Sequence, residues 1–410
     1  MTNRLAFLSP FQVRAFRFQF PGDLFTSWGT EMELIVLGWF ILEKTNSVLL
    51  LTLYGALQYI GTLVAPVMGL EGDRLGHRNV LSAMRSVYAL SALTLMTLAF
   101  LDALQPLYVF ILAGLSGLIR ASDVGMRNAL SADILPPEYL MAGVGLSRIT
   151  SDSARIAGAL AGAAIYAALG MAEACAVFAC CHVAGTTFTF LVGPSKNRTA
   201  VGASAFAQLR EGLVYVWNTP PVLASMWLAF LVNLTAWPWT LGLLPYVART
   251  VLNAGQPGLG AMAASFSAGA LAGSFSVSLI GRRIMPARFM LVGAMAWHAM
   301  LLVFAHMPTL GTACAMLAMA GCAQSLALTP MAVMLLHIAG ARFRGRIMGV
   351  RMLAIYGLPV GLLLAGTLIP HLGFRPTAVL YCSIGMATTG FIAWRWRAVL
   401  WPVSQPANAG

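Results

Sequence analysis

Long stretches of apolar residues, almost free of charge, recur along the whole chain. A run of about 20 such residues is what a helix needs to cross the hydrocarbon core of a bilayer. Of the 410 residues, 59% are hydrophobic and only 9% are charged, whereas about a quarter of the residues of a soluble domain are charged. A soluble fold would leave much of this apolar surface in water. The sequence therefore predicts an all-α membrane protein solvated largely by lipid.

Twelve such stretches are separated by short polar connections, many of them marked by proline or glycine. We expect membrane spans near residues 14–42, 47–70, 80–101, 106–131, 140–168, 172–193, 221–247, 258–280, 287–305, 309–338, 346–370 and 374–396. The longest polar connection divides them equally. We therefore predict an N-terminal six-helix bundle (1–193), a cytoplasmic linker (194–212), a C-terminal six-helix bundle (213–400) and a cytoplasmic tail (401–410).

A shift of about 204 residues aligns part of one half with the other, placing Gly145 on Gly349 and Gly162 on Gly366. Pseudo-symmetric halves of this kind are a known plan of membrane transporters, with the cargo site near the midplane between them. The repeat therefore favours a transporter.

The net charge of +12 follows the pattern that orients membrane proteins, and it does not indicate a nucleic-acid partner. With the N-terminus inside, 17 of the 25 basic residues, Arg85 among them, fall in cytoplasmic connections, and only Lys44, Arg249 and Arg375 fall outside. Such an excess marks the cytoplasmic side. We expect both termini in the cytoplasm, in a multi-pass protein of a bacterial-type inner membrane. The first 12 residues show no cleavage site, so no removed signal peptide is expected.

The connection after the second span reads Gly-Leu-Glu-Gly-Asp-Arg-Leu-Gly-His-Arg over residues 69–78. A very short turn needs glycine where a side chain would clash, and Asp73 can interact with the positive N-terminal end of a neighbouring helix. Arg74 and Arg78 suit the cytoplasmic side of the membrane. A plain basic loop that obeys the charge rule is the alternative interpretation. The spacing favours a gating motif; its residues are Gly69, Asp73, Arg74, Gly76 and Arg78.

This segment resembles the loop motif G-x-x-x-D-R-x-G-R-R of the major facilitator superfamily, from which only His77 departs. The segment from Arg120, within the fourth span, to Pro136, just after it, is similar to a segment of the exporter branch that includes enterobactin-exporter-like and macrolide-efflux-like proteins. The resemblance implies that Arg120 takes part in proton transfer. Gly145, Gly158 and Gly162 match half of the superfamily's antiporter motif, which lacks its proline here. The resemblance implies a twelve-helix transporter with proton antiport.

Charges within the predicted spans are functional candidates, because burying one in lipid costs at least about 2.5–3.5 kcal/mol. Counting along the fourth and fifth spans places Asp123 beside Arg148 at about 12 Å depth and Arg120 beside Asp152 at about 16–18 Å. We therefore predict a charge ladder between these two helices. It contains Arg120, Asp123, Arg127, Arg148, Asp152 and Arg155. Static ion pairs that only hold the helices together are the alternative.

Glu31 and Glu33 lie near the middle of the first span, about 200° apart around the helix, so we expect only one of them to face the cavity. A carboxylate there can load and release a coupling proton. Gly29 on the same helix, which would admit cargo, favours Glu31. No Asp or Glu follows Glu211, so any coupling carboxylate must lie in the first half. The candidates for proton coupling are Glu31, Glu33, Arg120, Asp123 and Asp152.

Aromatic residues gather on spans expected near the cavity, and packing is the alternative role for each of them. The candidate substrate-binding residues are Asp23, Trp28, Tyr59, Trp237, Trp239, Arg351 and Tyr356. Apolar pockets with a few polar groups suit amphiphilic organic ligands. With Arg351 in a half that lacks acids, and with the resemblance, a siderophore-like metabolite is favoured over a drug-like amphiphile.

We therefore expect a monomeric secondary transporter, driven by a proton gradient, that exports a small amphiphilic molecule and uses no cofactor. The six cysteines lack the paired spacing of a metal site, and no phosphate-binding loop of an ATP-driven pump or motif of a membrane enzyme is present. A lipid flippase on the same scaffold and a transport-dead ligand sensor stay as alternatives.

Overall fold

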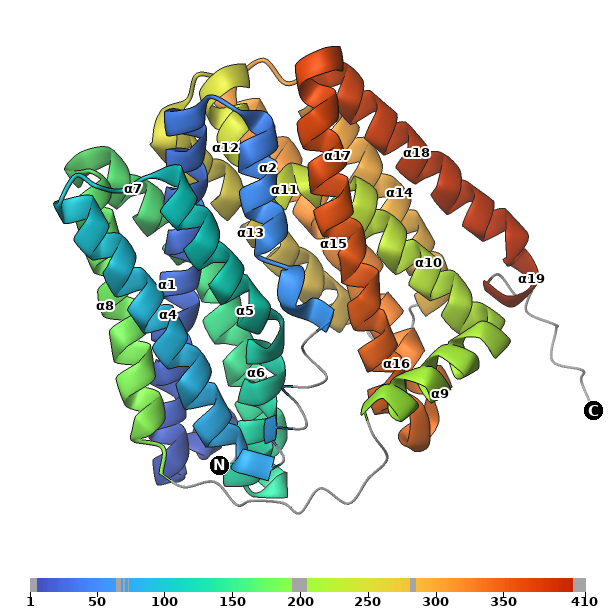
Figure 1. Cartoon of the computed structure of the whole chain (residues 1–410). Coiled ribbons are helices and arrows are strands. Elements are labelled where there is room, and N and C mark those ends of the chain that lie inside the picture. Colours follow the sequence, from blue (N-terminus) through green and yellow to red (C-terminus); the bar gives the residue numbers. More distant parts are fainter. Residues whose placement is uncertain are drawn as a thin grey trace, which may run out of the picture. The chain divides into compact units, whose positions relative to one another are not determined.

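The computed structural model describes residues 6–63, 68, 71–72, 74–193, 205–280 and 285–400, and every regular element in these ranges is a helix (Figure 1). Two compact units form: residues 1–205 with 241–267, and residues 206–240 with 268–410. This division differs from the predicted halves by the segment 241–267. That segment joins the first unit because the side chain of Pro245 lies beside Gly38 and the guanidinium of Arg249 donates to the Leu42 carbonyl.

The helices of the first unit follow one another with short connections. They are η1 (Ala6–Gln12), α1 (Arg14–Thr45), α2 (Val48–Leu57), η2 (Ile60–Leu63), α4 (His77–Phe100), α5 (Pro106–Ile134), α6 (Pro137–Ser153), the π-helical turn η3 (Ala154–Gly158), α7 (Ala159–Leu169), α8 (Met171–Phe190), α12 (Leu244–Tyr246) and the π-helical turn η4 (Val247–Val251). Helix α1 packs most extensively on α8, and α8 also packs on α4. These three helices form the centre of the unit.

The second unit begins with a helix at the end of the linker and continues through the remaining spans. Its helices are α9 (Ala205–Asn218), α10 (Pro220–Thr235), α11 (Pro238–Leu241), α14 (Pro286–Phe304), α15 (Leu310–Ile338), α16 (Gly340–Leu353), η6 (Ala354–Tyr356), α17 (Gly357–Leu372), α18 (Phe374–Arg395) and α19 (Arg397–Leu400). Helix α13 (Gly255–Ile280) is divided between the two units. Helix α14 packs on both α15 and α18 and forms the centre here.

Eight helical stretches of the described chain are long and apolar enough to cross a membrane, and they coincide with eight of the twelve expected spans. The other four expected spans, near 14–42, 47–70, 140–168 and 221–247, coincide with helices that are charged, short or interrupted. Irregular or charged helices are tolerated at membrane depth where protein buries them or where they line a cavity. The least regular spans thus carry most of the candidate residues.

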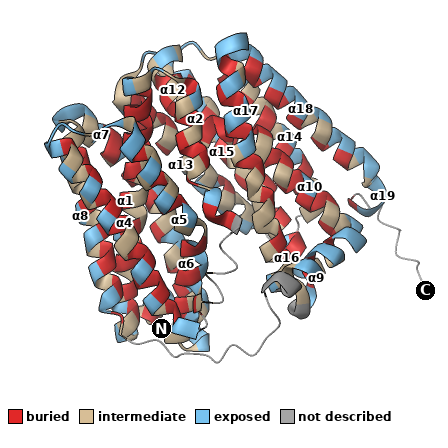
Figure 2. Ribbon diagram, viewed as in Figure 1, coloured by how far each residue is buried: buried red, intermediate tan, exposed pale blue. Residues whose placement is uncertain are grey.

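The burial pattern is that of a lipid-solvated bundle (Figure 2). Large apolar side chains remain exposed along the outer faces of the helices, including Leu90, Leu279 and Trp394. A water-soluble protein rarely exposes contiguous apolar surface of this extent. The exposed apolar faces therefore agree with the membrane location predicted from composition.

Candidate functional site

Four helices of the first unit, α1, α4, α5 and α8, bring buried charges together. Arg85 on α4 forms an ion pair with Asp23 on α1 and also donates to the hydroxyl of Thr189 on α8. The amide of Gln19 lies 3.4 Å from the Asp23 carboxylate and donates to the carbonyl of Arg127 at 2.9 Å. One polar network therefore joins all four helices inside an apolar bundle.

The position of Arg85 differs from the prediction, in which it is one of the basic residues of the cytoplasmic connections. Its side chain is only 1% exposed and lies on the third turn of α4. A count of basic residues marks the side of the membrane but does not detect an arginine whose charge a distant carboxylate compensates. Asp23, predicted to bind substrate, is buried in this pair.

The predicted ladder between the fourth and fifth spans is corrected in its pairing. Asp123 lies 2.9 Å from Arg127, and Arg148 lies 3.2 Å from Asp152, each pair within one helix. Residues four apart are neighbours on a helix surface, so these contacts form without an adjacent helix. The cross-helix pairs Asp123–Arg148 and Arg120–Asp152 are thus replaced in the described structure. The side chain of Arg148 is 68% exposed, and Arg155 is also exposed, on the π-helical turn η3.

Arg120 on α5 connects to α1 and to the end of α2. It donates to the side-chain oxygen of Gln58 at 2.9 Å, and its guanidinium lies 3.9 Å from the carboxylate of Glu31. Gln58 is held there by close backbone packing, because a Cβ added at Gly117 of α5 would lie 1.9 Å from the carbonyl oxygen of Leu57. Any side chain at Gly117 would force the two helices apart and separate Gln58 from Arg120.

Glu33 has a partner that the sequence analysis missed. Its carboxylate oxygen lies 3.1 Å from Nε2 of His182 on α8, and the side chains are 11% and 1% exposed. Gly29, one turn before Glu33, leaves the space for the imidazole: a Cβ there would lie 3.1 Å from His182 Nε2. The space that was expected to admit cargo is therefore filled by His182. No pattern in the sequence connects Glu33 with a histidine 149 residues away.

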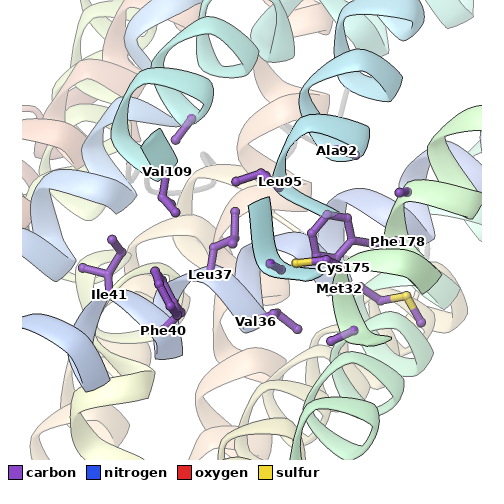
Figure 3. Packing of buried hydrophobic residues seen from close by; sticks show 14 of the residues in the cluster. Met32, Val36, Leu37, Phe40, Ile41, Ala92, Leu95, Val109, Cys175 and Phe178 are labelled. Carbon is purple, nitrogen blue, oxygen red and sulfur yellow. The ribbon is translucent and has the colours of Figure 1, made fainter. Parts of the chain in front are cut away.

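The Glu33–His182 pair lies next to an apolar cluster formed by the second half of α1 with α4, α5 and α8. Figure 3 shows this packing, which includes Val36, Leu37, Leu95 and Phe178. Met32, next to Glu33 in the chain, belongs to the same cluster. Electrostatic interactions are strengthened in such surroundings because the local dielectric constant is low.

A small, partly open pocket with a cavity volume of about 10 Å³ lies between α1, α2, α4 and α5. Its lining is Thr30, Glu33, Leu34, Tyr54, Gln58, Tyr88, Ser116 and Arg120. A cavity of roughly this volume has room for a single water molecule, so this pocket suits water and not a whole amphiphile. It places Glu33 and Arg120 on the wall of the same space.

The gating motif is described in part. Gly76 has φ +88°, a conformation that favours glycine, and it precedes the first turn of α4. Arg78 donates to the carbonyl of Phe190 at the end of α8, and Arg74 lies 3.5 Å from Glu71 on the surface. Gly69 and Asp73 lie outside the described residues. His77 stands where the superfamily motif has arginine. Nδ1 of His77 lies 2.6 Å from the buried carboxylate of Asp133.

The three glycines of the half-matched antiporter motif have different surroundings. A Cβ at Gly162 of α7 would lie 3.0 Å from the Cα of Met32, and one at Gly158 of η3 would lie 3.2 Å from the Cβ of Glu31. An added Cβ at Gly145 of α6 would meet nothing within 4 Å. Gly158 and Gly162 therefore allow the fifth expected span to approach α1 beside the two glutamates.

The remaining substrate-binding candidates lie in two different units. In the first unit, Trp28 donates to the hydroxyl of Ser153 at 3.4 Å, and Tyr59 is half-buried between α2 and η2. In the second unit, Trp239 is 1% exposed and donates to the carbonyl of Thr235, so it packs in the core.

Trp237 of the second unit makes an edge-to-face contact with the ring of Trp297 at 5.1 Å. Arg351 and Tyr356 are half-buried there. The histidine at position 298 is fully buried and lies 2.8 Å from the hydroxyl of Thr235. These contacts describe a packed unit whose described residues after Glu211 carry no carboxylate side chain.

Known proteins resemble this chain over nearly its whole length. The sequence profile of a family described as transmembrane secretion effector matches residues 5–406. The multidrug efflux pump Tap of Mycolicibacterium fortuitum is 26% identical over 382 residues, which cover 89% of this chain and 91% of that protein.

Solved transporter structures share the fold at low sequence identity. The nucleoside transporter NupG (D323A mutant) superposes with a TM-score of 0.74 at 13% identity, covering 95% of this chain and all of that chain. The D-xylose–proton symporter has a TM-score of 0.71 at 14% identity, with 92% and 96% coverage. A POT family transporter in complex with a thioalcohol-conjugated peptide has a TM-score of 0.75 at 11% identity, with 95% and 97% coverage.

The family match together with the shared fold makes this chain a multi-pass membrane transporter of the major facilitator superfamily, and not an enzyme. Within it, the chain belongs to the transmembrane secretion effector family. The family resemblance predicted from the loop motif is thereby confirmed.

Proposed function

We propose that this transporter is a proton-coupled exporter of small amphiphilic organic molecules. The observation that carries the proposal is the meeting of Glu31, Glu33 and Arg120 inside the first unit, where an ion pair and a small polar pocket interrupt an apolar bundle. Placing a carboxylate inside the membrane costs free energy, so a carboxylate there indicates a functional role. A charge that changes with proton binding gives a transporter two states of different stability.

The proposed topology has twelve spans, with both termini in the cytoplasm of a bacterial-type cell and the chain in its inner membrane as a monomer. It is supported by the distribution of basic residues, 16 inside once Arg85 is set aside, against three outside, because such an excess marks the cytoplasmic side. The proton gradient is the energy source, and no cofactor takes part. Protons enter the cell as cargo leaves.

Two cargo classes have separate support. The likeness to the multidrug efflux pump Tap supports a drug-like amphiphile. Arg351, half-buried in a unit without carboxylates after Glu211, supports an anionic or metal-chelating metabolite such as a siderophore. The sequence favours the siderophore, and the experiment that follows includes a cargo of each class.

Purified protein in liposomes with an acidic lumen tests the proposal directly. The lumen should accumulate ethidium, or in a parallel experiment an iron-free catecholate siderophore, as protons leave. Ethidium carries a permanent charge, so it does not redistribute by titrating itself. A protonophore should lower the initial rate at least about tenfold if the proton gradient supplies the energy. Flux that ignores both the gradient and the protonophore would contradict proton coupling.

A pair of arginine variants separates coupling from general damage. Arg120→Gln removes the contacts with Glu31 and Gln58 and should abolish uphill flux. Arg375→Gln removes an exposed arginine at the start of α18 and should transport like the unaltered protein. Movement of a fluorescent phospholipid with no flux of either cargo would favour the flippase. Ethidium binding in detergent without any flux would favour the sensor.

A further inference from the structure

We propose that the Glu33–His182 pair is the proton-carrying site of this transporter, an assignment that rests on the proton-coupled export proposed above. Glu33 Oε2 and His182 Nε2 are 3.1 Å apart, on α1 and α8, and both side chains are nearly inaccessible. Neither their partnership nor a role for His182 follows from the motifs of the sequence.

The partners of the other intramembrane carboxylates distinguish this pair. Asp133, in the last turn of α5, also pairs with a histidine, His77, but it does not line the pocket that Glu33 shares with Arg120. Among the described residues, four other carboxylates each lie within salt-bridge distance of an arginine: Asp23 with Arg85, Glu31 with Arg120, Asp123 with Arg127, and Asp152 with Arg148. Arginine stays charged in proteins, so protonating any of these carboxylates would leave an arginine uncompensated. Glu33 has a histidine instead, which can lose its charge.

A carboxylate and an imidazole together have several protonation states, and the net charge of the pair stays small in each of them. Small net charge limits the free-energy cost of placing the pair in an apolar bundle. An ionised Glu33 with a neutral imidazole accepts a hydrogen bond from Nε2–H. A proton added to the carboxylate leaves both groups neutral, and a proton added to the ring gives an ion pair. Histidine is the side chain whose charge changes between about pH 5 and 8. The pair can therefore gain and lose a proton without breaking an arginine ion pair.

The pocket beside Glu33 gives the proton a polar environment. Tyr88 and Ser116 line it with Glu33, and their hydroxyl oxygens are buried without a hydrogen-bond partner in the described structure. Nδ1 of His182 is also buried without one. Unpaired buried polar atoms are costly, so the pocket favours a hydrogen-bonding occupant such as water. Water there would connect Glu33 to the rest of the pocket.

Ionisable groups surround the pair on every neighbouring element. They are Asp23 and Glu31 on α1, Tyr54 on α2, Arg85 and Tyr88 on α4, Arg120 and Asp123 on α5, Arg148 and Asp152 on α6, Arg155 on η3, Tyr166 on α7, and Cys175 and Cys181 on α8. The hydroxyl of Tyr54 donates to the Glu33 carbonyl at 3.5 Å, and the ring of Tyr88 lies 5.7 Å from the imidazole. Arg120 is the cation that lines the pocket together with Glu33.

Proton binding at Glu33 would act on cargo through the charge of the pocket. With Glu33 ionised, two carboxylates face Arg120, because Glu31 is 3.9 Å away and Glu33 lines the same pocket. The negative charge left over attracts a cationic or hydrogen-bond-donating group of the cargo. With Glu33 protonated, Glu31 and Arg120 balance each other and this attraction is lost, so the cargo is released as the proton binds. This provides the differential interaction that a two-state carrier needs.

Infrared difference spectra recorded without cargo test the site itself. Protein in liposomes is titrated between about pH 5 and 8, and the carbonyl stretch of a protonated carboxyl group is followed. We expect one such band from within the membrane. It should vanish in Glu33→Gln and persist in Glu31→Gln, the matched variant two residues away whose carboxylate pairs with Arg120. A band that persists in Glu33→Gln, or spectra of the unaltered protein with neither this band nor the ring bands of a protonated His182, would overturn the assignment.

A second variant keeps the test decisive if Glu33→Gln fails to fold, which size-exclusion chromatography would reveal. His182→Gln keeps a donor near the Nε2 position and removes the titratable ring. If the ring shares the proton, the midpoint of the carboxyl band should change in this variant. An unchanged midpoint would show that His182 does not share the proton.

Transport measured in the same liposomes separates this inference from the proposed function. If ethidium or siderophore flux follows the proton gradient but both the carboxyl band and the ring bands are absent, or the carboxyl band does not depend on Glu33, the proton site is elsewhere and the exporter stands. If the band behaves as expected while flux ignores the gradient, the proton site stands and proton-coupled export is wrong.

Discussion

Asp23 and Arg85 form an ion pair between α1 and α4 in which the two side chains are 3% and 1% exposed. Thr189 of α8 accepts a further hydrogen bond from Arg85, and Gln19 lies beside Asp23. The pair therefore joins the three central helices of the first unit. Its contribution differs from that of a surface ion pair, because neither charge has water as an alternative partner.

Removing one member of this pair should strongly destabilise the protein. Arg85→Ala or Asp23→Asn leaves a buried group without its partner, at a cost of about 3–5 kcal/mol. We expect a clear fall in the apparent melting temperature in detergent, measured by intrinsic fluorescence. The double variant Asp23→Asn/Arg85→Gln should recover part of the loss, because two neutral amides leave no buried charge.

The pair Arg148–Asp152 provides the control for this measurement. The arginine side chain is 68% exposed, and exposed ion pairs contribute only about 0–1 kcal/mol. Arg148→Ala should leave the melting temperature nearly unchanged. A loss as large as that of Arg85→Ala would show that the stability does not follow burial.

His77 and Asp133 give a prediction about the departure from the loop motif. Nδ1 of His77 lies 2.6 Å from the Asp133 carboxylate, and these side chains are 10% and 3% exposed. The superfamily motif has arginine here, which can keep an ion pair with the same carboxylate. His77→Arg should therefore fold and transport, whereas Asp133→Ala should lower both the melting temperature and ethidium flux. Equal losses in the two variants would argue against an ion pair as the requirement at this site.

The antiporter-motif glycines should respond differently to one substitution. Gly162→Leu places a side chain against the backbone of α1, with the Cβ only 3.0 Å from Met32 Cα. Overpacking of this kind costs about 1–3 kcal/mol, so the melting temperature should fall, and flux should fall with it because Glu31 and Glu33 lie on either side of Met32. Gly145→Leu enters open space and should be tolerated. A harmless Gly162→Leu would contradict the close packing.

The sequence predicts the helical membrane fold well because its signals are long and repeated. Apolar runs of span length and the loop motif are read without knowing which helix lies beside which. Eight of the expected spans agree with helices of sufficient length and hydropathy, whereas the span near 221–247 is divided into α10, α11, α12 and η4. A window of hydropathy does not detect such interruptions.

Side-chain partners were predicted less well, for a physical reason. Depth along a helix follows from counting residues, but the direction of a side chain around the helix depends on packing. Asp123 and Arg148 were matched by depth alone, and each instead contacts a residue of its own helix. Arg85 and His182 pair with α1 residues 62 and 149 positions away. Only the packing of α4 and α8 on α1 brings these partners together.

Gly29 provides a last prediction, because it controls the position of His182 without being ionisable itself. A Cβ at Gly29 would lie 3.1 Å from Nε2 of His182 and 3.2 Å from the Cβ of Cys181. Gly29→Val should push the imidazole away from Glu33, one turn further along α1. The carboxyl band of Glu33 should then change its midpoint, and gradient-driven ethidium flux should fall at least about tenfold if the pair carries the proton.

The matched variant is Gly38→Ala on the same helix, where a Cβ would lie 3.4 Å from a side-chain carbon of Pro245. That distance is ordinary van der Waals contact, so Gly38→Ala should leave the midpoint of the carboxyl band unchanged. A smaller change, Gly29→Ala, should give an intermediate effect, since the imidazole needs to yield by only a few tenths of an ångström. A graded response from glycine through alanine to valine would link transport to the position of the ring. Unchanged flux and an unchanged band in Gly29→Val would mean that His182 does not need to lie beside Glu33.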